Sequence, residues 1–147
     1  MTIGYTTGVY DLFHIGHLNM LKNAKGLCDK LIVGVARDEI ITYKPRKVII
    51  PFEERIEIIR SIKYVDIAIP QDSIDVDYKF EMWKKLHFDI IFTGDDWYGV
   101  KRWQDLEEKF KSVDVKVMYF PYTKGTSSTL INQTLSYLHE ENQKHSR

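Results

Sequence analysis

The chain has 147 residues, 44% of them hydrophobic and 29% charged, and its 21 basic side chains balance 21 acidic ones. This composition predicts one folded domain and argues against a disordered chain, and the scattering of basic residues among acidic ones argues against a nucleic-acid partner. We expect a cytoplasmic protein without membrane association, because there is no apolar run of about eighteen residues and the N-terminal residues enter a predicted strand directly.

Strand-like and helix-like patterns then alternate along the sequence. A β-branched run predicts a first strand at 3–7, and a helical apolar pattern begins after Gly16 and ends near Cys28, the single cysteine, which we expect to be a buried structural thiol. Further strands are predicted at 30–36, 65–69, 88–93 and 115–120, with Pro70 closing the second of these four. Further helices are predicted at 52–62, 78–86, 102–110 and 127–139.

This alternation predicts a single α/β domain at residues 1–139, a Rossmann-like, doubly wound fold with a mainly parallel five-stranded sheet. Residues 140–147 form a polar C-terminal tail. In such a sheet, ligands bind at the edge where the parallel strands end. That edge should gather four segments: 8–17, the loop around Lys44, 94–97 and 123–129.

The segment between Gly8 and His17 carries the clearest chemical signal. Gly8 and Gly16 bracket a strand-to-helix turn, which is where a backbone approaches a phosphate closely. His14 and His17 are three residues apart across the helix start, so both rings can direct an N–H group to one oxygen. A zinc site is the competing interpretation, but this pair has no third ligand close in the sequence.

Three other polar clusters follow predicted strands or open a helix. The basic residues 44–47 lie in a loop, where such a cluster is often only solvated. The two carboxylates of 94–97 can hold a hydrated Mg²⁺ or accept hydrogen bonds from ribose and base, although aspartates also stabilise ordinary turns. Gly125 and the hydroxyl residues after it form a helix start that offers a second phosphate cradle, or a simple N-cap.

These segments resemble a known family. Residues 8–17 resemble the G-x-[FY]-D-x-x-H-x-G-H segment of the HIGH-motif nucleotidyltransferases, and the Gly-Asp-Asp-Trp string at 94–97 is similar to that of the bacterial glycerol-3-phosphate cytidylyltransferase group. The resemblance implies transfer of CMP from CTP to a small phosphorylated alcohol, with glycerol 3-phosphate as the leading acceptor and Mg²⁺ as cofactor. It also implies a homodimer and a CDP-alcohol product that feeds cell-wall or capsule polymer synthesis.

The resemblance also implies roles for individual residues. The catalytic group comprises His14, His17, Lys44 and Ser127. The nucleotide-binding group comprises Thr7, Gly8, Val9, Tyr10, Asp11, Gly16, Gly94, Asp95, Asp96, Trp97, Tyr122, Thr123, Lys124, Gly125, Ser128 and Thr129. The acceptor-binding group comprises Arg46, Arg55, Lys63 and Lys79, and Asp11 is also expected to contact the metal.

The chain departs from the family pattern at two positions of the last cradle. Tyr122 stands where the family has arginine, and Thr126 stands where it has isoleucine. Loss of that cation weakens the expected grip on the triphosphate unless Lys124 replaces it. Two alternatives therefore stay open: an adenylyltransferase acting on another phosphate monoester such as FMN, and a non-catalytic nucleotide-binding subunit.

Overall fold

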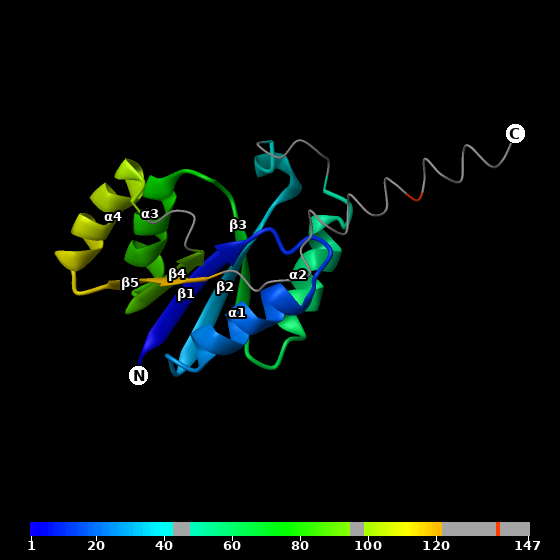
Figure 1. Ribbon diagram of the computed structural model, residues 1–147, viewed down its shortest axis with the longest axis horizontal. Coiled ribbons are helices and arrows are strands. Elements are labelled where there is room, and N and C mark those ends of the chain that lie inside the picture. Colours follow the sequence, from blue (N-terminus) through cyan, green and yellow to red (C-terminus); the bar gives the residue numbers. More distant parts are fainter. Residues whose placement is uncertain (43–47, 95–98, 122–137, 139–147) are drawn as a thin grey trace, which may run out of the picture.

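The protein is built around a parallel β-sheet with helices on both faces (Figure 1). The structure, a computed structural model, describes residues 1–42, 48–94, 99–121 and 138. Within these residues the sheet has five strands in the order β3-β2-β1-β4-β5, all parallel. The strands are β1 (Ile3–Gly8), β2 (Lys30–Ala36), β3 (Ile67–Gln71), β4 (Ile90–Gly94) and β5 (Lys116–Phe120). The predicted Rossmann-like fold is therefore confirmed.

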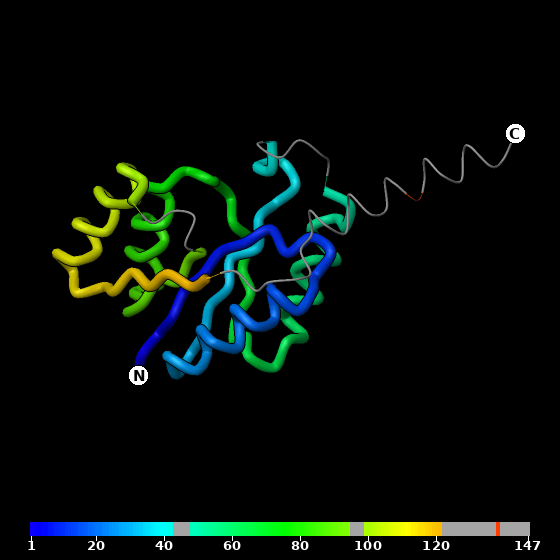
Figure 2. Tube along the Cα trace, viewed as in Figure 1, coloured from blue at the N-terminus to red at the C-terminus, as the bar shows by residue number. Residues whose placement is uncertain are grey.

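Among the described residues, two pairs of helices cover the two faces of the sheet. In chain order the helices are α1 (Ile15–Lys25), the short 3₁₀ helix η1 (Asp38–Ile40), α2 (Phe52–Arg60), α3 (Val76–Leu86) and α4 (Lys101–Lys111). One core cluster joins the apolar sides of α1 and α2 to one face of the sheet, and a second cluster joins α3 and α4 to the other face. The path of the chain through these layers can be followed in Figure 2.

Strand β2 shows why its sequence is a continuous apolar run. Leu31, Val33 and Val35 belong to the core under α1 and α2, whereas Ile32 belongs to the core under α3 and α4. Both sets are buried, because a strand in the interior of a doubly covered sheet has no solvent-facing side. The continuous apolar run at 30–36 is therefore explained by the burial of both sides of β2.

The third strand differs from its prediction. The sequence predicts a strand at 65–69 that Pro70 ends, but β3 starts at Ile67 and includes Pro70, which lies opposite Val35. Strand β3 is at the edge of the sheet, where half of the backbone groups have no neighbouring strand, so a residue without an N–H group is tolerated. Just before the start of β3, a side chain and not a backbone carbonyl of residue 66 binds the neighbouring strand. The Asp66 carboxylate accepts a hydrogen bond from the Leu31 N–H at 2.7 Å.

Helix α3 begins two residues before its predicted start. The Asp75 side chain accepts a hydrogen bond from the Asp77 N–H and caps the helix, a role that the sequence pattern did not reveal. Cys28 is partly buried against Gly4 and Ala24, and burial raises the pKa of its thiol, as expected for a structural cysteine. The predicted helix at 127–139 lies outside the described residues, except for Leu138, which is helical and exposed.

No helix among the described residues is long and apolar enough to cross a membrane.

Candidate active site

The centre of the site is the carboxyl edge of the sheet, where the parallel strands end. Strand β1 has β2 on one side and β4 on the other, so the chain order reverses beside β1. In doubly wound sheets, ligands bind in the crevice at such a reversal. The structure places Thr7 and Gly8, at the end of β1, and Gly94, at the end of β4, on this edge.

The turn after β1 has an unusual backbone. Tyr10 and Leu12 both have left-handed conformations, with φ of 56° and 51°. Tyr10 folds back into the core under α1 and α2, and its ring lies so close to Gly8 that a Cβ atom there would come within 2.8 Å of it. Glycine at position 8 therefore allows the fold-back, and strained residues of this kind concentrate at functional sites.

His14 and His17 cap the start of α1 through their own rings. The Gly16 N–H donates to Nδ1 of His14 at 3.0 Å, and the His14 N–H donates to Nδ1 of His17 at 3.2 Å. The two rings are stacked, with centroids 3.9 Å apart. Because a backbone N–H can donate only to an unprotonated nitrogen, each neutral ring carries its hydrogen on Nε2.

This arrangement fixes the chemistry that the pair can perform. Burial lowers the pKa of His14 below its usual value of 6.5, so the ring is neutral at pH 7. Two neutral imidazoles with Nε2–H groups at a helix N-terminus are hydrogen-bond donors suited to a phosphate oxygen. They are not arranged as a nucleophile and its base.

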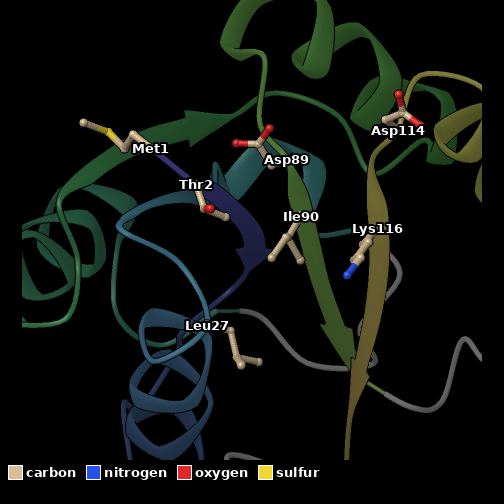
Figure 3. A pocket seen from close by; sticks show the side chains of 7 residues that line it. All are labelled: Met1, Thr2, Leu27, Asp89, Ile90, Asp114 and Lys116. Carbon is tan, nitrogen blue, oxygen red and sulfur yellow. The ribbon is translucent and has the colours of Figure 1, made fainter.

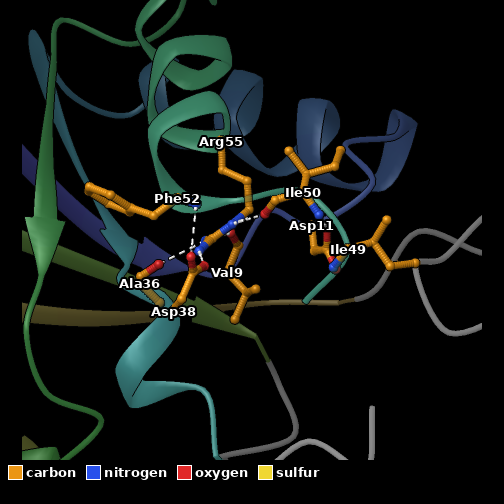
Figure 4. Close-up of polar contacts among 8 residues, drawn as sticks. All are labelled: Val9, Asp11, Ala36, Asp38, Ile49, Ile50, Phe52 and Arg55. Atoms are coloured by element: carbon orange, nitrogen blue, oxygen red, sulfur yellow. Dashed lines mark hydrogen bonds and ion pairs between the residues drawn. The ribbon is translucent and has the colours of Figure 1, made fainter. Parts of the chain in front are cut away.

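Asp11 is held by the backbone of the segment before α2. Its carboxylate oxygens accept hydrogen bonds from the Ile49 and Ile50 N–H groups, both at 2.9 Å (Figure 4). The side chain is only 5% exposed. These contacts join the turn after β1 to the residues that follow the basic loop, and contact with a metal ion stays a prediction.

Arg55 lies beside Asp11 and is fully buried. Its Nε donates to the Ile50 carbonyl at 2.8 Å, and its Nη1 donates to the carbonyls of Val9 and Ala36 at 2.7 and 2.8 Å. Its Nη2 forms an ion pair with Asp38 at 2.5 Å. The guanidinium group therefore points into the protein (Figure 4), and a direct contact with the acceptor stays a prediction.

Lys79 lies on the opposite face of the sheet, at the start of α3. Its Nζ donates to Oγ1 of Thr7 at 2.9 Å and lies 5.7 Å from the centre of the Trp103 ring. The residue is only 9% exposed, and burial lowers the pKa of its ammonium group to about 8. Among the described residues, no carboxylate lies within ion-pair distance of this nitrogen.

Lys63 does not lie with these residues. It follows α2 and precedes β3, and chain segments that lead from a helix into a parallel strand lie at the amino edge of the sheet. The side chain is exposed and packs on the Tyr64 ring. Within one chain Lys63 is thus separated from the histidines by the length of a strand, and its contact with the acceptor stays a prediction.

An open hollow also lies at the amino edge, away from the histidines. Asp89, Asp114 and Lys116 line it together with the N-terminal residues (Figure 3). One Asp89 oxygen already accepts a hydrogen bond from the Ile3 N–H. This hollow therefore contributes nothing to the site at the carboxyl edge.

Several predicted site residues lie outside the described part of the chain. They are Lys44, Arg46, Asp95, Asp96, Trp97, Tyr122, Thr123, Lys124, Gly125, Ser127, Ser128 and Thr129. Among the described residues, no group of three or more His, Cys, Asp or Glu side chains is arranged to hold a metal ion.

Sequence reasoning missed Asp38 as a member of the site. Its carboxylate pairs with Arg55 and accepts a hydrogen bond from the Phe52 N–H at 3.3 Å. The available signal was an aspartate two residues after the end of a buried strand, where site residues concentrate. Its partner is 17 residues away, so no helical or strand spacing connects the two.

Comparison with known proteins matches most of the chain. The family model described as "Cytidylyltransferase-like" matches residues 5–137. Glycerol-3-phosphate cytidylyltransferase from Staphylococcus aureus is 35% identical over 130 residues, which cover 88% of this chain and 92% of that protein.

Other similar proteins have different names. FAD synthase from Pyrococcus abyssi is 40% identical over 116 residues, which cover 75% of this chain and 72% of that protein. Among solved structures, the lipopolysaccharide core biosynthesis protein from Thermoplasma volcanium superposes with a TM-score of 0.67 at 28% identity, over 86% of this chain and 99% of that one.

Proposed function

This chain belongs to the cytidylyltransferase-like family, and we propose that it transfers CMP from CTP to glycerol 3-phosphate or a similar small phosphorylated alcohol. The observation that supports this proposal most strongly is the stacked pair of His14 and His17, whose Nε2–H groups lie at the start of α1 beside the end of β1. The similarity to glycerol-3-phosphate cytidylyltransferase over 88% of the chain supports the choice of nucleotide and acceptor.

In the proposed reaction, an acceptor phosphate oxygen forms a bond to the α-phosphorus of CTP. The bond from that phosphorus to the bridging oxygen breaks, and pyrophosphate leaves with the bonding electrons, giving a CDP-alcohol. The acceptor phosphate is already an anion, so no protein base or covalent nucleophile is needed. The two Nε2–H groups stabilise the charge that develops on the phosphoryl oxygens, and each such donor is worth a factor of about 10² to 10³ in rate.

We propose that Lys79 binds the acceptor. Its ammonium group is buried beside Thr7 at the carboxyl edge, and the described residues supply a hydroxyl and an aromatic ring but no carboxylate as partners. A buried cation without a carboxylate is costly unless an anion or a set of oxygen atoms joins it. A phosphorylated polyol supplies an anion in its phosphate group and oxygen atoms in its hydroxyl groups.

The residues outside the described part keep their predicted roles as proposals. Lys44 and Ser127 act on the triphosphate, and Arg46 on the acceptor. The segments at 94–97 and 122–129 hold the nucleotide. The homodimer and the use of the product in cell-wall or capsule polymers are also proposals.

Mg²⁺ is proposed to arrive bound to the triphosphate. Mg²⁺ keeps several water ligands and is typically held by one or two carboxylates together with substrate phosphates, so the lack of an acidic cluster among the described residues is compatible with it. The Asp11 oxygens already accept two backbone hydrogen bonds and fit such a weak, shared role better than a complete metal site. When bound, the ion neutralises triphosphate charge.

A second candidate is adenylyl transfer from ATP to FMN. It is supported by the FAD synthases, which are as similar in identity to this chain as the cytidylyltransferases are. The two candidates share the histidine pair and differ in the base and in the size of the acceptor.

A substrate panel separates the candidates. Pyrophosphate release is measured with CTP or ATP, each combined with glycerol 3-phosphate or FMN. We expect the highest rate with CTP and glycerol 3-phosphate. The highest rate with ATP and FMN would replace the first candidate by the second, and no release with any pair would favour a nucleotide-binding subunit without activity.

The histidine pair is tested in the same assay. His17→Ala should lower kcat by a factor of about 10² to 10³ with the fold intact, because one donor to the phosphoryl group is lost. His87→Asn is the matched control, since His87 is exposed, caps the far end of α3 and has a left-handed backbone that asparagine tolerates. Equal rates in the two variants would contradict the mechanism.

A further inference from the structure

We infer that Arg55 is a positioning residue that fixes the turn carrying His14 and His17, through hydrogen bonds that reach Val9 directly and Asp11 by way of Ile50. This inference gives Arg55 a role inside the protein and not on the acceptor.

The contacts form a closed ring. Arg55 donates to the Ile50 carbonyl, and the Ile50 N–H donates to the Asp11 carboxylate. Asp11 is two residues after Val9, whose carbonyl accepts from Arg55 again. Every bond of the ring lies between 2.7 and 2.9 Å, so the turn after β1 is tied at both ends to one guanidinium group (Figure 4).

The rest of the guanidinium group ties this ring to the sheet. It donates to the Ala36 carbonyl at the end of β2 and pairs with Asp38 in η1. Arginine suits this position because its planar fork directs several donors at fixed angles, which the single ammonium group of lysine cannot do. The Arg55 side chain is 0% exposed, whereas Asp38 is 43% exposed, so the pair is buried at its basic end.

The turn needs such a constraint. Tyr10, between Val9 and Asp11, and Leu12, directly after Asp11, both have left-handed backbones that cost energy for residues with a side chain. His14 follows two residues after Leu12 and starts α1. If the ring opens, the turn can relax, and the two imidazoles lose the geometry in which the backbone N–H groups donate to their Nδ1 atoms.

The experiment compares Arg55→Lys with Phe110→Leu. The second variant is a matched control, because Phe110 is fully buried in the core on the other face of the sheet and contacts neither histidine. Both variants are studied under conditions in which at least nine tenths of the molecules are folded, as judged from their unfolding curves. Asp38→Asn is the milder second variant, since this half-exposed residue can change without loss of the fold.

Two readouts distinguish positioning from general support of the fold. The first is ¹⁵N NMR of the imidazole nitrogens in the free protein, which needs no substrate and therefore stands even if the proposed function fails. The second is the division of the effect between kcat and KM in the transfer reaction, which rests on the proposed function.

For Arg55→Lys we expect mixed Nδ1–H and Nε2–H signals for His14 and His17, where the wild type shows Nε2–H alone. We also expect a fall in kcat of about 10²-fold with little change in the KM of either substrate, because a misplacement of about 1 Å has an effect of this size. Asp38→Asn should change both readouts in the same direction by less, and Phe110→Leu should change neither.

Two results would overturn the inference. One is unchanged imidazole signals in both Arg55→Lys and Asp38→Asn. The other is an acceptor KM that rises while kcat stays constant, which would return Arg55 to the acceptor site. If Arg55→Lys does not fold, the imidazole signals of Asp38→Asn alone test the inference. Mixed signals would support it, and unchanged signals would overturn it.

Discussion

Two buried cations lie beside the end of β1, on opposite faces of the sheet, and they differ in how fully the protein satisfies them. Arg55 has three backbone carbonyls and one carboxylate as partners. Among the described residues, Lys79 has one hydroxyl and an aromatic ring as partners. Burial lowers the pKa of Lys79 to about 8.

The difference suggests different tasks. A buried cation with a complete set of partners fixes the parts that it joins, and removing it leaves those partners unsatisfied. A buried cation with an incomplete set is a liability for the fold unless a ligand supplies the missing partner. We therefore assign Arg55 to the framework of the site and propose a binding role for Lys79.

The largest effect on stability is expected from Arg55→Ala. It should lower the free energy of unfolding by about 3 to 5 kcal/mol, because three carbonyls and Asp38 lose a buried partner. Urea unfolding measures the change. Arg60→Ala is the control on the same helix, since its ion pair with Glu57 is exposed and 3.9 Å long, and it should change stability by less than about 0.5 kcal/mol. Similar losses in the two variants would contradict the contrast between buried and exposed arginine.

Lys79→Met should have the opposite pattern. We expect the KM of the acceptor to rise about 10- to 100-fold, because one charge-assisted hydrogen bond to the ligand is lost. Stability should stay equal or increase, since an apolar side chain of similar length replaces a buried ammonium group that has no carboxylate partner among the described residues. Steady-state kinetics and urea unfolding test the two parts. A loss of stability with an unchanged acceptor KM would make Lys79 a framework residue like Arg55.

The pH dependence of stability gives a smaller effect at the same residue. The folded-state pKa of Lys79, about 8, lies below its usual value of 10.5, so between these values the unfolded chain binds more protons than the folded protein. The stability of the wild type relative to Lys79→Met should therefore rise by about 1.4 kcal/mol for each pH unit above 8, up to pH 10.5. Urea unfolding of both proteins from pH 7 to 9.5 measures this difference. A difference that does not change with pH would show that Lys79 has no lowered pKa.

The smallest effect on stability is expected from His14, below pH 6.5. Burial lowers the pKa of this ring, so its contribution to stability is complete above pH 6.5 and is lost as the pH falls through the lowered value. Protonation of Nδ1 also removes the acceptor of the Gly16 N–H. An NMR titration of the imidazole signals follows this step. Its midpoint should lie below 6.5 in the native protein and at the ordinary value in urea, and equal midpoints would contradict the burial argument.

Much of the fold was predictable because its signals are local. A strand covered on both faces must be apolar throughout, as in β2, and the glycines around the His14 turn mark a sharp change of chain direction. The errors at Pro70 and Asp66 arose because the sequence does not show that β3 lies at the edge of the sheet. The sequence does not show which edge of the sheet the Lys63 segment reaches, for a related reason, so the role of this residue stays a prediction.

The sequence by itself determined the alternation of strands and helices, the parallel sheet and the histidine pair at the start of α1, because these depend on residues close together in the chain. Only the tertiary structure decided that Arg55 joins Val9, Ala36, Asp38 and Ile50, and that Lys79 reaches Thr7 across 72 positions. Such contacts depend on strand order and on which face each helix covers. Neither property leaves a periodic pattern in the sequence, so the partners of the two buried cations became known only from the fold.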